Sequence, residues 1–212
     1  MIRSLIWDAG GTLFNTYPAA VMAFRRALHE RGLSVPQTRI LELCKHSLRH
    51  CTTTLARDFE LDRSVLYTSF KEYYAQIPLS AQYPFPGVVD VCALVCEHGG
   101  DNFVVTHRCR ASLMALMAEY QMAHYFSDFI TSDDGYPRKP DPASIQALLQ
   151  RHALVLDATL AIGDRDIDIR AAMRAGVHTC FFGEVPSNVQ PDLTITDFQD
   201  LKRMLLDVWV EK

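Results

Sequence analysis

Two patterns of apolar and polar positions divide this chain. From residue 81 onward, short apolar runs alternate with amphipathic stretches of about a dozen residues. The runs read NFVVT, DFIT, TLAIG and HTCFF, and a fifth run, SLIWD, lies at residues 4–8. Runs that are apolar throughout are typical of strands buried on both faces of a parallel sheet. Strands that alternate with helices predict an α/β fold with a doubly wound parallel sheet.

The second pattern covers residues 17–80, where apolar side chains recur at helical spacing and no run is typical of a strand. Helices are expected at about residues 18–32, 36–50 and 62–77. Proline near the first turn and glycine at the end support the first of them, and Asp62 is suited to cap the third.

Together these patterns predict two domains. Residues 1–16 and 81–212 are expected to form a Rossmann-like α/β core, because strands occur on both sides of the helical block. Residues 17–80 are expected to form a smaller, all-helical cap inserted after the first core strand.

Composition and charge narrow the classes of partner. The 212 residues are 49% hydrophobic and 22% charged, as in ordinary globular proteins, and the formal net charge is −4. No basic patch indicates nucleic acid, no apolar run is long enough to span a membrane, and Asp8 comes too early for a signal peptide. The expectation is a cytoplasmic protein with reduced cysteines, a monomer or homodimer, that binds neither nucleic acid nor membrane.

Candidate chemistry lies where the predicted strands end. Ligands of open parallel sheets bind beyond the carboxyl ends of the strands. Polar residues follow four of these ends, namely Asp8, Thr106, Lys139 and Asp164. Each alone is better explained by an ordinary structural role. Together they supply what phosphoryl transfer needs, a nucleophile, carboxylates for a hard cation such as Mg²⁺, and groups that hold the phosphoryl oxygens.

The motifs WDAGGTL, VVTHR, RKPDP and IGDRDID, in this order, resemble the haloacid dehalogenase (HAD) superfamily across nearly the whole chain. The resemblance implies that Asp8 forms an aspartyl-phosphate intermediate. It also implies that Mg²⁺ binds Asp8, Asp164 and the backbone carbonyl of Gly10. Asp168, one helical turn after Asp164, is expected to orient the site directly or through water.

The remaining expected contacts concern the phosphoryl group. Thr106 and Lys139 are expected to hold it, and the N–H groups of Gly10 and Gly11 are candidate donors. Arg165 and Asp166 follow Asp164 directly. Either residue could line the cleft, but alternation at a helix start directs one of the two toward solvent.

Gly10 departs from the pattern of the superfamily's phosphatases. The resemblance places a second Asp at this position, which protonates the leaving oxygen and then activates water. Such general acid and base help is worth ~10² to 10⁴ in rate, so its loss bears directly on function.

Three interpretations follow. In the first, which is the favoured one, the protein is a Mg²⁺-dependent, phosphoglycolate-phosphatase-like enzyme that acts on a small phosphorylated metabolite. Either the substrate then has a good leaving group, or another residue supplies the proton. His107 is the first candidate, followed by Tyr17 and His46. The alternative for His107 is a hydrogen-bonded structural role.

In the second interpretation the protein resembles the superfamily's phosphonatases, which use a cap lysine to form a Schiff base. Lys45 is the candidate here, although Lys139 departs from the arginine associated with that group. The metal-free dehalogenase route is disfavoured by the presence of Asp164 and Asp168.

In the third interpretation the protein binds a phosphorylated ligand or holds a slow phospho-aspartate as a sensor. In the favoured interpretation the cap is expected to exclude water and select the substrate. Tyr17, Lys45, His46 and Arg49 are its candidate specificity contacts.

Overall fold

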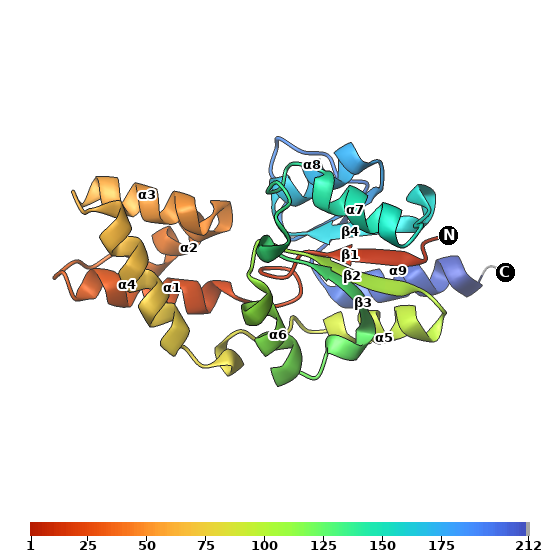
Figure 1. Cartoon of the computed structure of the whole chain (residues 1–212), viewed down its shortest axis with the longest axis horizontal. Coiled ribbons are helices and arrows are strands. Elements are labelled where there is room, and N and C mark those ends of the chain that lie inside the picture. The colour runs from red at the N-terminus through yellow and green to blue at the C-terminus, as the bar shows by residue number, and fades with distance from the viewer. Residues whose placement is uncertain (211–212) are drawn as a thin grey trace. The chain divides into compact units, whose positions relative to one another are not determined.

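The computed structural model describes residues 1–210, which form two compact units. The larger unit combines Met1–Phe14 with Pro84–Lys212, and the smaller unit is Asn15–Tyr83. Figure 1 shows that the first strand belongs to the larger unit, because the chain leaves that unit after one strand and returns to it later.

A parallel sheet forms the centre of the larger unit. Its six strands have the order β3-β2-β1-β4-β5-β6, and every neighbouring pair is parallel. The strands are β1 (Ser4–Trp7), β2 (Asp101–Val105), β3 (Phe126–Ile130), β4 (Thr159–Gly163), β5 (His178–Phe182) and β6 (Leu193–Ile195). The predicted doubly wound α/β fold is confirmed. The first five strands coincide with the predicted apolar runs, whereas β6 was not predicted because it is short and buries only Ile195.

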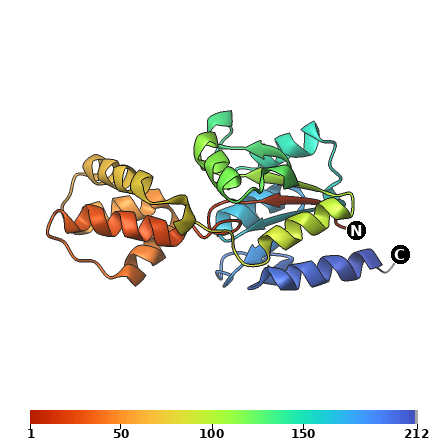
Figure 2. The same ribbon diagram turned by 90° about the horizontal axis from the view of Figure 1, so that it is seen from below.

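Helices cover both faces of this sheet (Figures 1 and 2). Ile6 packs in one apolar cluster with Ile145 and Ala172 of α7 and α8. The next residue, Trp7, contacts Phe198 of α9 on the opposite face, with ring centroids 5.7 Å apart. The helices of this unit are α5 (Val88–Glu97), α6 (Arg110–Glu119), α7 (Ala143–Arg151), α8 (Asp166–Ala175) and α9 (Phe198–Val210). The short 3₁₀ turns are η2 (Ala123–Tyr125), η3 (Ser132–Asp134) and η4 (Leu156–Ala158).

The smaller unit is helical and has an apolar core of its own. It contains α1 (Tyr17–His29), α2 (Gln37–His46), α3 (Leu48–Asp58), α4 (Arg63–Gln76) and the 3₁₀ turn η1 (Leu79–Ala81). Phe24 and Phe70 stack at its centre with ring centroids 4.1 Å apart. As expected, the Asp62 side chain caps α4 by accepting the N–H groups of Ser64 and Val65.

One expected helix is two helices in the structure. Residues 36–50 were expected to form a single helix, but α2 ends at His46 and α3 begins at Leu48. Ser47 between them has extended backbone, with φ −178° and ψ 157°, and its side chain accepts the N–H of His50 at 2.9 Å. Serine competes in this way for backbone donors at helix starts, and the periodicity of apolar positions does not reveal it.

None of the helices within residues 1–210 combines the length and apolar character needed to cross a membrane.

Candidate functional site

Three carboxylates meet at the carboxyl end of the sheet. Asp8 follows β1 directly, and its N–H donates to the carbonyl of Ile162 in β4 at 2.9 Å. Asp164 follows β4, and Asp168 lies in the first turn of α8. One carboxylate oxygen from each of the three lies within 4.8 Å of the others, and Asp8 and Asp168 are buried. Oxygen ligands gathered so closely fit a hard divalent cation such as Mg²⁺.

Lys139 supplies a buried positive charge to this cluster. Its Nζ lies 2.5 Å from Asp8 Oδ1, 2.6 Å from Asp168 Oδ1 and 3.0 Å from the Val105 carbonyl. Burial alone would lower the pKa of Lys139, but the charges of Asp168 and Asp8 raise it above its usual value. The lysine is therefore held as an ammonium ion that donates hydrogen bonds to Asp8 and to the Val105 carbonyl and pairs with Asp168.

The two buried carboxylates differ in their electrostatic environment. Burial raises the pKa of Asp8 above its usual value despite the nearby Lys139. Burial acts on Asp168 in the same direction, but the charges of Lys139 and Arg165 outweigh it, so the pKa of Asp168 is lowered. Asp168 is thus held ionised by the two cations beside it.

Glycines let these carboxylates approach the backbone. Gly11 has φ +96°, and a Cβ placed on it would lie 2.3 Å from Asp164 Oδ2. A Cβ on Gly163 would lie 2.3 Å from the Cβ of Asp168. The Thr12 hydroxyl also donates to Asp164 Oδ1 at 3.2 Å. Sequence reasoning missed Thr12 and Gly163, and the GGT and IGD spacings were the only signals for them.

The loop after Asp8 is closed by its own backbone. The Gly11 N–H donates to the Phe14 carbonyl at 2.8 Å, and the Phe14 N–H donates to the Ala9 carbonyl at 2.9 Å. The Gly11 amide, a candidate phosphate donor from the sequence, is thus already engaged within the loop. The N–H and carbonyl of Gly10 take no part in these two bonds.

Thr106 and His107 follow β2. Thr106 is buried, and its N–H donates to the Ile130 carbonyl. Its hydroxyl oxygen accepts the N–H of Arg108 at 3.2 Å. Nε2 of His107 accepts the backbone N–H of Lys139 at 2.9 Å. Burial, with the charges of Lys139 and Arg138, lowers the pKa of His107 to about 3. A neutral ring whose Nε2 is engaged is poorly suited to protonate a leaving group, so these contacts favour the structural interpretation of His107.

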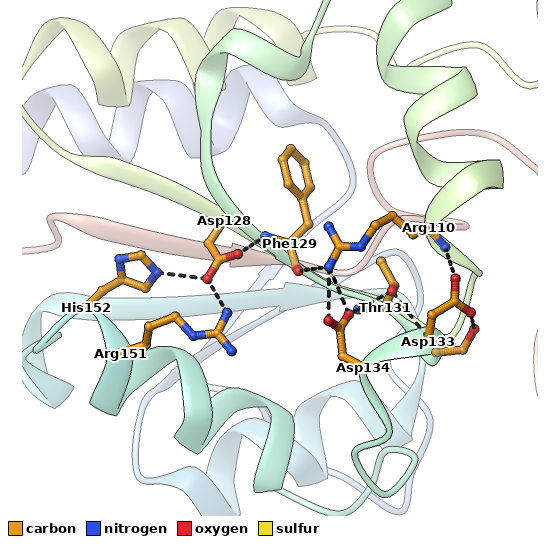
Figure 3. A network of polar contacts seen from close by, with 9 residues as sticks. Arg110, Asp128, Phe129, Thr131, Asp133, Asp134, Arg151 and His152 are labelled. Atoms are coloured by element: carbon orange, nitrogen blue, oxygen red, sulfur yellow. Dashed lines mark hydrogen bonds and ion pairs between the residues drawn. The ribbon is translucent and has the colours of Figure 1, made fainter.

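Further polar contacts join the loops that follow β2 and β3, as Figure 3 shows. The Arg110 guanidinium donates to Asp134 and to the carbonyl of Phe129, each at 3.0 Å. The Arg110 N–H donates to Asp133 at 2.9 Å, and the Thr131 hydroxyl donates to Asp134 at 2.8 Å. The network thus joins the segment that follows Thr106 to the loop that leads toward Lys139.

The candidate specificity residues lie in the helical unit. Tyr17, at the start of α1, packs against the apolar core of that unit. Lys45 and His46, in the last turn of α2, and Arg49, near the start of α3, are exposed. The rings of His46 and His50 lie 5.0 Å apart. None of these four residues belongs to the unit that carries the carboxylates.

Comparison with known proteins extends this description. Residues 5–182 match the model of a family described as haloacid dehalogenase-like hydrolase. A phosphoglycolate phosphatase of Pectobacterium atrosepticum is 29% identical over 94% of this chain and 91% of that protein. A hydrolase from Streptococcus pneumoniae TIGR4 is 29% identical, with a TM-score of 0.70 over 96% of this chain and 98% of that one.

A solved structure from Haemophilus somnus, described as a predicted phosphoglycolate phosphatase, has a TM-score of 0.84 at 20% identity. It covers 96% of this chain and 98% of its own. At this identity the likeness concerns the fold alone.

Replacing Gly11 by alanine is expected to destabilise the protein by about 2 kcal/mol or more, because the new Cβ meets the Asp164 carboxylate in a strained backbone conformation. Gly32→Ala is the matched control, since Gly32 also has positive φ but has nothing within 4 Å of the added atom. Urea unfolding measures both variants. Equal losses would show that the contact with Asp164 has no effect.

The burial of His107 also predicts that the stability of the protein depends on pH. Its pKa is about 3 in the folded protein and about 6.5 unfolded, so between these values the unfolded chain binds an extra proton and stability falls as pH falls. His107→Gln keeps an acceptor but does not titrate. From pH 6 to pH 4 the wild type is expected to lose about 1 kcal/mol more per pH unit than the variant. Urea unfolding at several pH values measures this, and parallel curves would contradict it.

Proposed function

The chain belongs to the haloacid dehalogenase-like hydrolase family, and we propose that it is a Mg²⁺-dependent phosphatase of a small phosphorylated metabolite, acting through an aspartyl phosphate on Asp8. The observation that carries this proposal is the position of Asp8. It lies buried beside Lys139 and close to the carboxylates of Asp164 and Asp168, at the end of the sheet where ligands of such folds bind.

Asp8 is the proposed nucleophile. The Lys139 ammonium holds Oδ1, which fixes the orientation of the carboxylate before the substrate arrives. Attack on phosphorus forms a bond from an Asp8 oxygen and breaks the bond to the leaving oxygen. Water then cleaves the acyl phosphate and restores the carboxylate.

The cation would be held by Asp8, Asp164 and the Gly10 carbonyl, with Asp168 directly or through water. When bound, it offsets the negative charge that would otherwise oppose a phosphate dianion. The Thr106 hydroxyl and Lys139 are proposed to hold the phosphoryl oxygens. His107 would keep the backbone of Lys139 in place through the bond to its N–H.

The leaving group is proposed to depart without a proton from the residues around Asp8. Gly10 has no side chain, the Nε2 of His107 accepts a hydrogen bond, and the Lys139 ammonium is held charged by Asp8 and Asp168. Substrates whose leaving oxygen is already a stable anion, such as aryl and acyl phosphates, suit such a site best. The phosphoglycolate named for relatives such as the Pectobacterium protein is an alkyl phosphate and is the natural substrate to compare.

Replacing Asp8 by asparagine is expected to lower Mg²⁺-dependent hydrolysis of an aryl phosphate by at least about 10³-fold, because the amide cannot form the intermediate. Asp166→Asn is the matched control, since Asp166 pairs with Arg170 on the surface of α8. Release of the aryl alcohol measures both. Undiminished hydrolysis by Asp8→Asn would rule out this nucleophile.

Replacing Gly10 by aspartate is expected to favour poor leaving groups. The new carboxyl group can act as general acid, so the kcat/KM ratio of phosphoglycolate to aryl phosphate should rise by about 10-fold or more. Gly99→Asp, which adds a carboxylate at the amino end of β2, is expected to leave this ratio unchanged. Phosphate release from both substrates measures it, and an unchanged ratio in Gly10→Asp would show that the proton is not limiting.

A further inference from the structure

Arg165 brings a second cation to the carboxylates. It follows Asp164 directly, and its backbone N–H donates to Asp168 Oδ2 at 3.1 Å. Its side chain is only 17% exposed, with Nε 3.7 Å from Asp168 Oδ2 and Nη2 4.0 Å from Asp8 Oδ1. The side chain is therefore directed toward the proposed nucleophile and not toward solvent.

The two cations beside Asp8 contact it differently. Lys139 lies within hydrogen-bond distance of Oδ1, whereas Nη2 of Arg165 lies beyond it. A guanidinium at this separation is too far to bond to Asp8 and close enough to reach an oxygen of a group attached to Asp8. Lys139 is thus placed to orient the carboxylate as well as to contact the phosphoryl group, whereas Arg165 is placed only to contact the phosphoryl group.

The charge balance of the cluster also supports a role for Arg165 in contacting phosphate. Three carboxylates face two cations, so the cluster lacks one positive charge before any cation or substrate binds. A phosphate group adds further negative charge. Without Arg165 only Lys139 would remain among the cations that the structure places within 4 Å of Asp8.

We propose that Arg165 is a catalytic residue, whose guanidinium donates hydrogen bonds to the oxygens of the phosphoryl group during its transfer to Asp8. This rests on the proposed function. Arginine suits the role because its planar donors match phosphate geometry and its charge is permanent. For the same reason it gives no proton. The leaving oxygen departs with the electron pair of the broken bond and takes its proton from water, which suits the substrates that a site with Gly10 favours.

Arg165→Met and Arg165→Lys test the proposal in the full chain. The Met variant is expected to lower kcat/KM for an aryl phosphate by about 10²- to 10³-fold. The Lys variant keeps the positive charge but lacks the planar set of donors, so its kcat/KM is expected to fall less. Arg170→Met is the matched control, because Arg170 lies on α8, the helix that follows Arg165, and contacts Asp166 and the Asn188 carbonyl. Where Arg165→Met does not fold, Arg165→Gln replaces it.

Two further measurements separate catalysis from a structural role. Binding of inorganic phosphate, followed by calorimetry, needs no turnover and is expected to weaken about 10-fold in Arg165→Met. Methylguanidine is expected to restore part of the activity of Arg165→Ala but none of that of Asp8→Asn. A variant that only melts earlier, with phosphate affinity and kcat/KM within twofold of wild type, would overturn the proposal.

Failure of the proposed function is recognised separately. A wild type that turns over no phosphate ester, yet binds phosphate through Arg165, would remove the phosphatase proposal and leave Arg165 as a phosphate contact. If hydrolysis is lost in Asp8→Asn but unchanged in Arg165→Met, the role proposed for Arg165 is wrong and the phosphatase proposal stands.

Discussion

The buried ammonium group of Lys139 is the contact on which the rest of this site depends. Removing an ion from water costs several kcal/mol, and this cost is offset only where good partners surround the charge. The partners of Lys139 are Asp8 after β1, the Val105 carbonyl of β2 and Asp168 of α8. Three segments far apart in sequence are thereby held at one point. The same charge makes it possible to bury two carboxylates side by side.

The sheet makes this meeting possible. β1 lies between β2 and β4, with Trp7 opposite Val104 on one side and Ile162 on the other. The ends of these three strands therefore lie at one level, and the residues that follow them enter a common space. Gly11 and Gly163 then remove the atoms that would collide with Asp164 and Asp168. The two carboxylates can therefore occupy these positions only because the neighbouring backbone positions carry no side chain.

Much of this arrangement could be predicted from the sequence, because apolar runs mark buried strands and polar residues mark their ends. The neighbourhood of Asp8 and Asp164 follows from that rule, because each residue directly follows a strand. The contact between His107 and the backbone of Lys139 does not, since it depends on how two loops fold against each other. Ser47 and β6 were missed for a related reason, as a single capping hydroxyl and a three-residue strand leave no periodic pattern.

The network in Figure 3 also has a consequence for solubility. β3 is an edge strand, and its Ile130 carbonyl bonds inward to Thr106, so the neighbouring Phe129 presents its backbone groups outward. The Phe129 N–H donates to Asp128 at 2.7 Å, and its carbonyl accepts from Arg110. A strand from another molecule would have to displace both side chains before it could pair there. These side chains thus protect this part of the β3 edge from the edge-to-edge association that leads to aggregation.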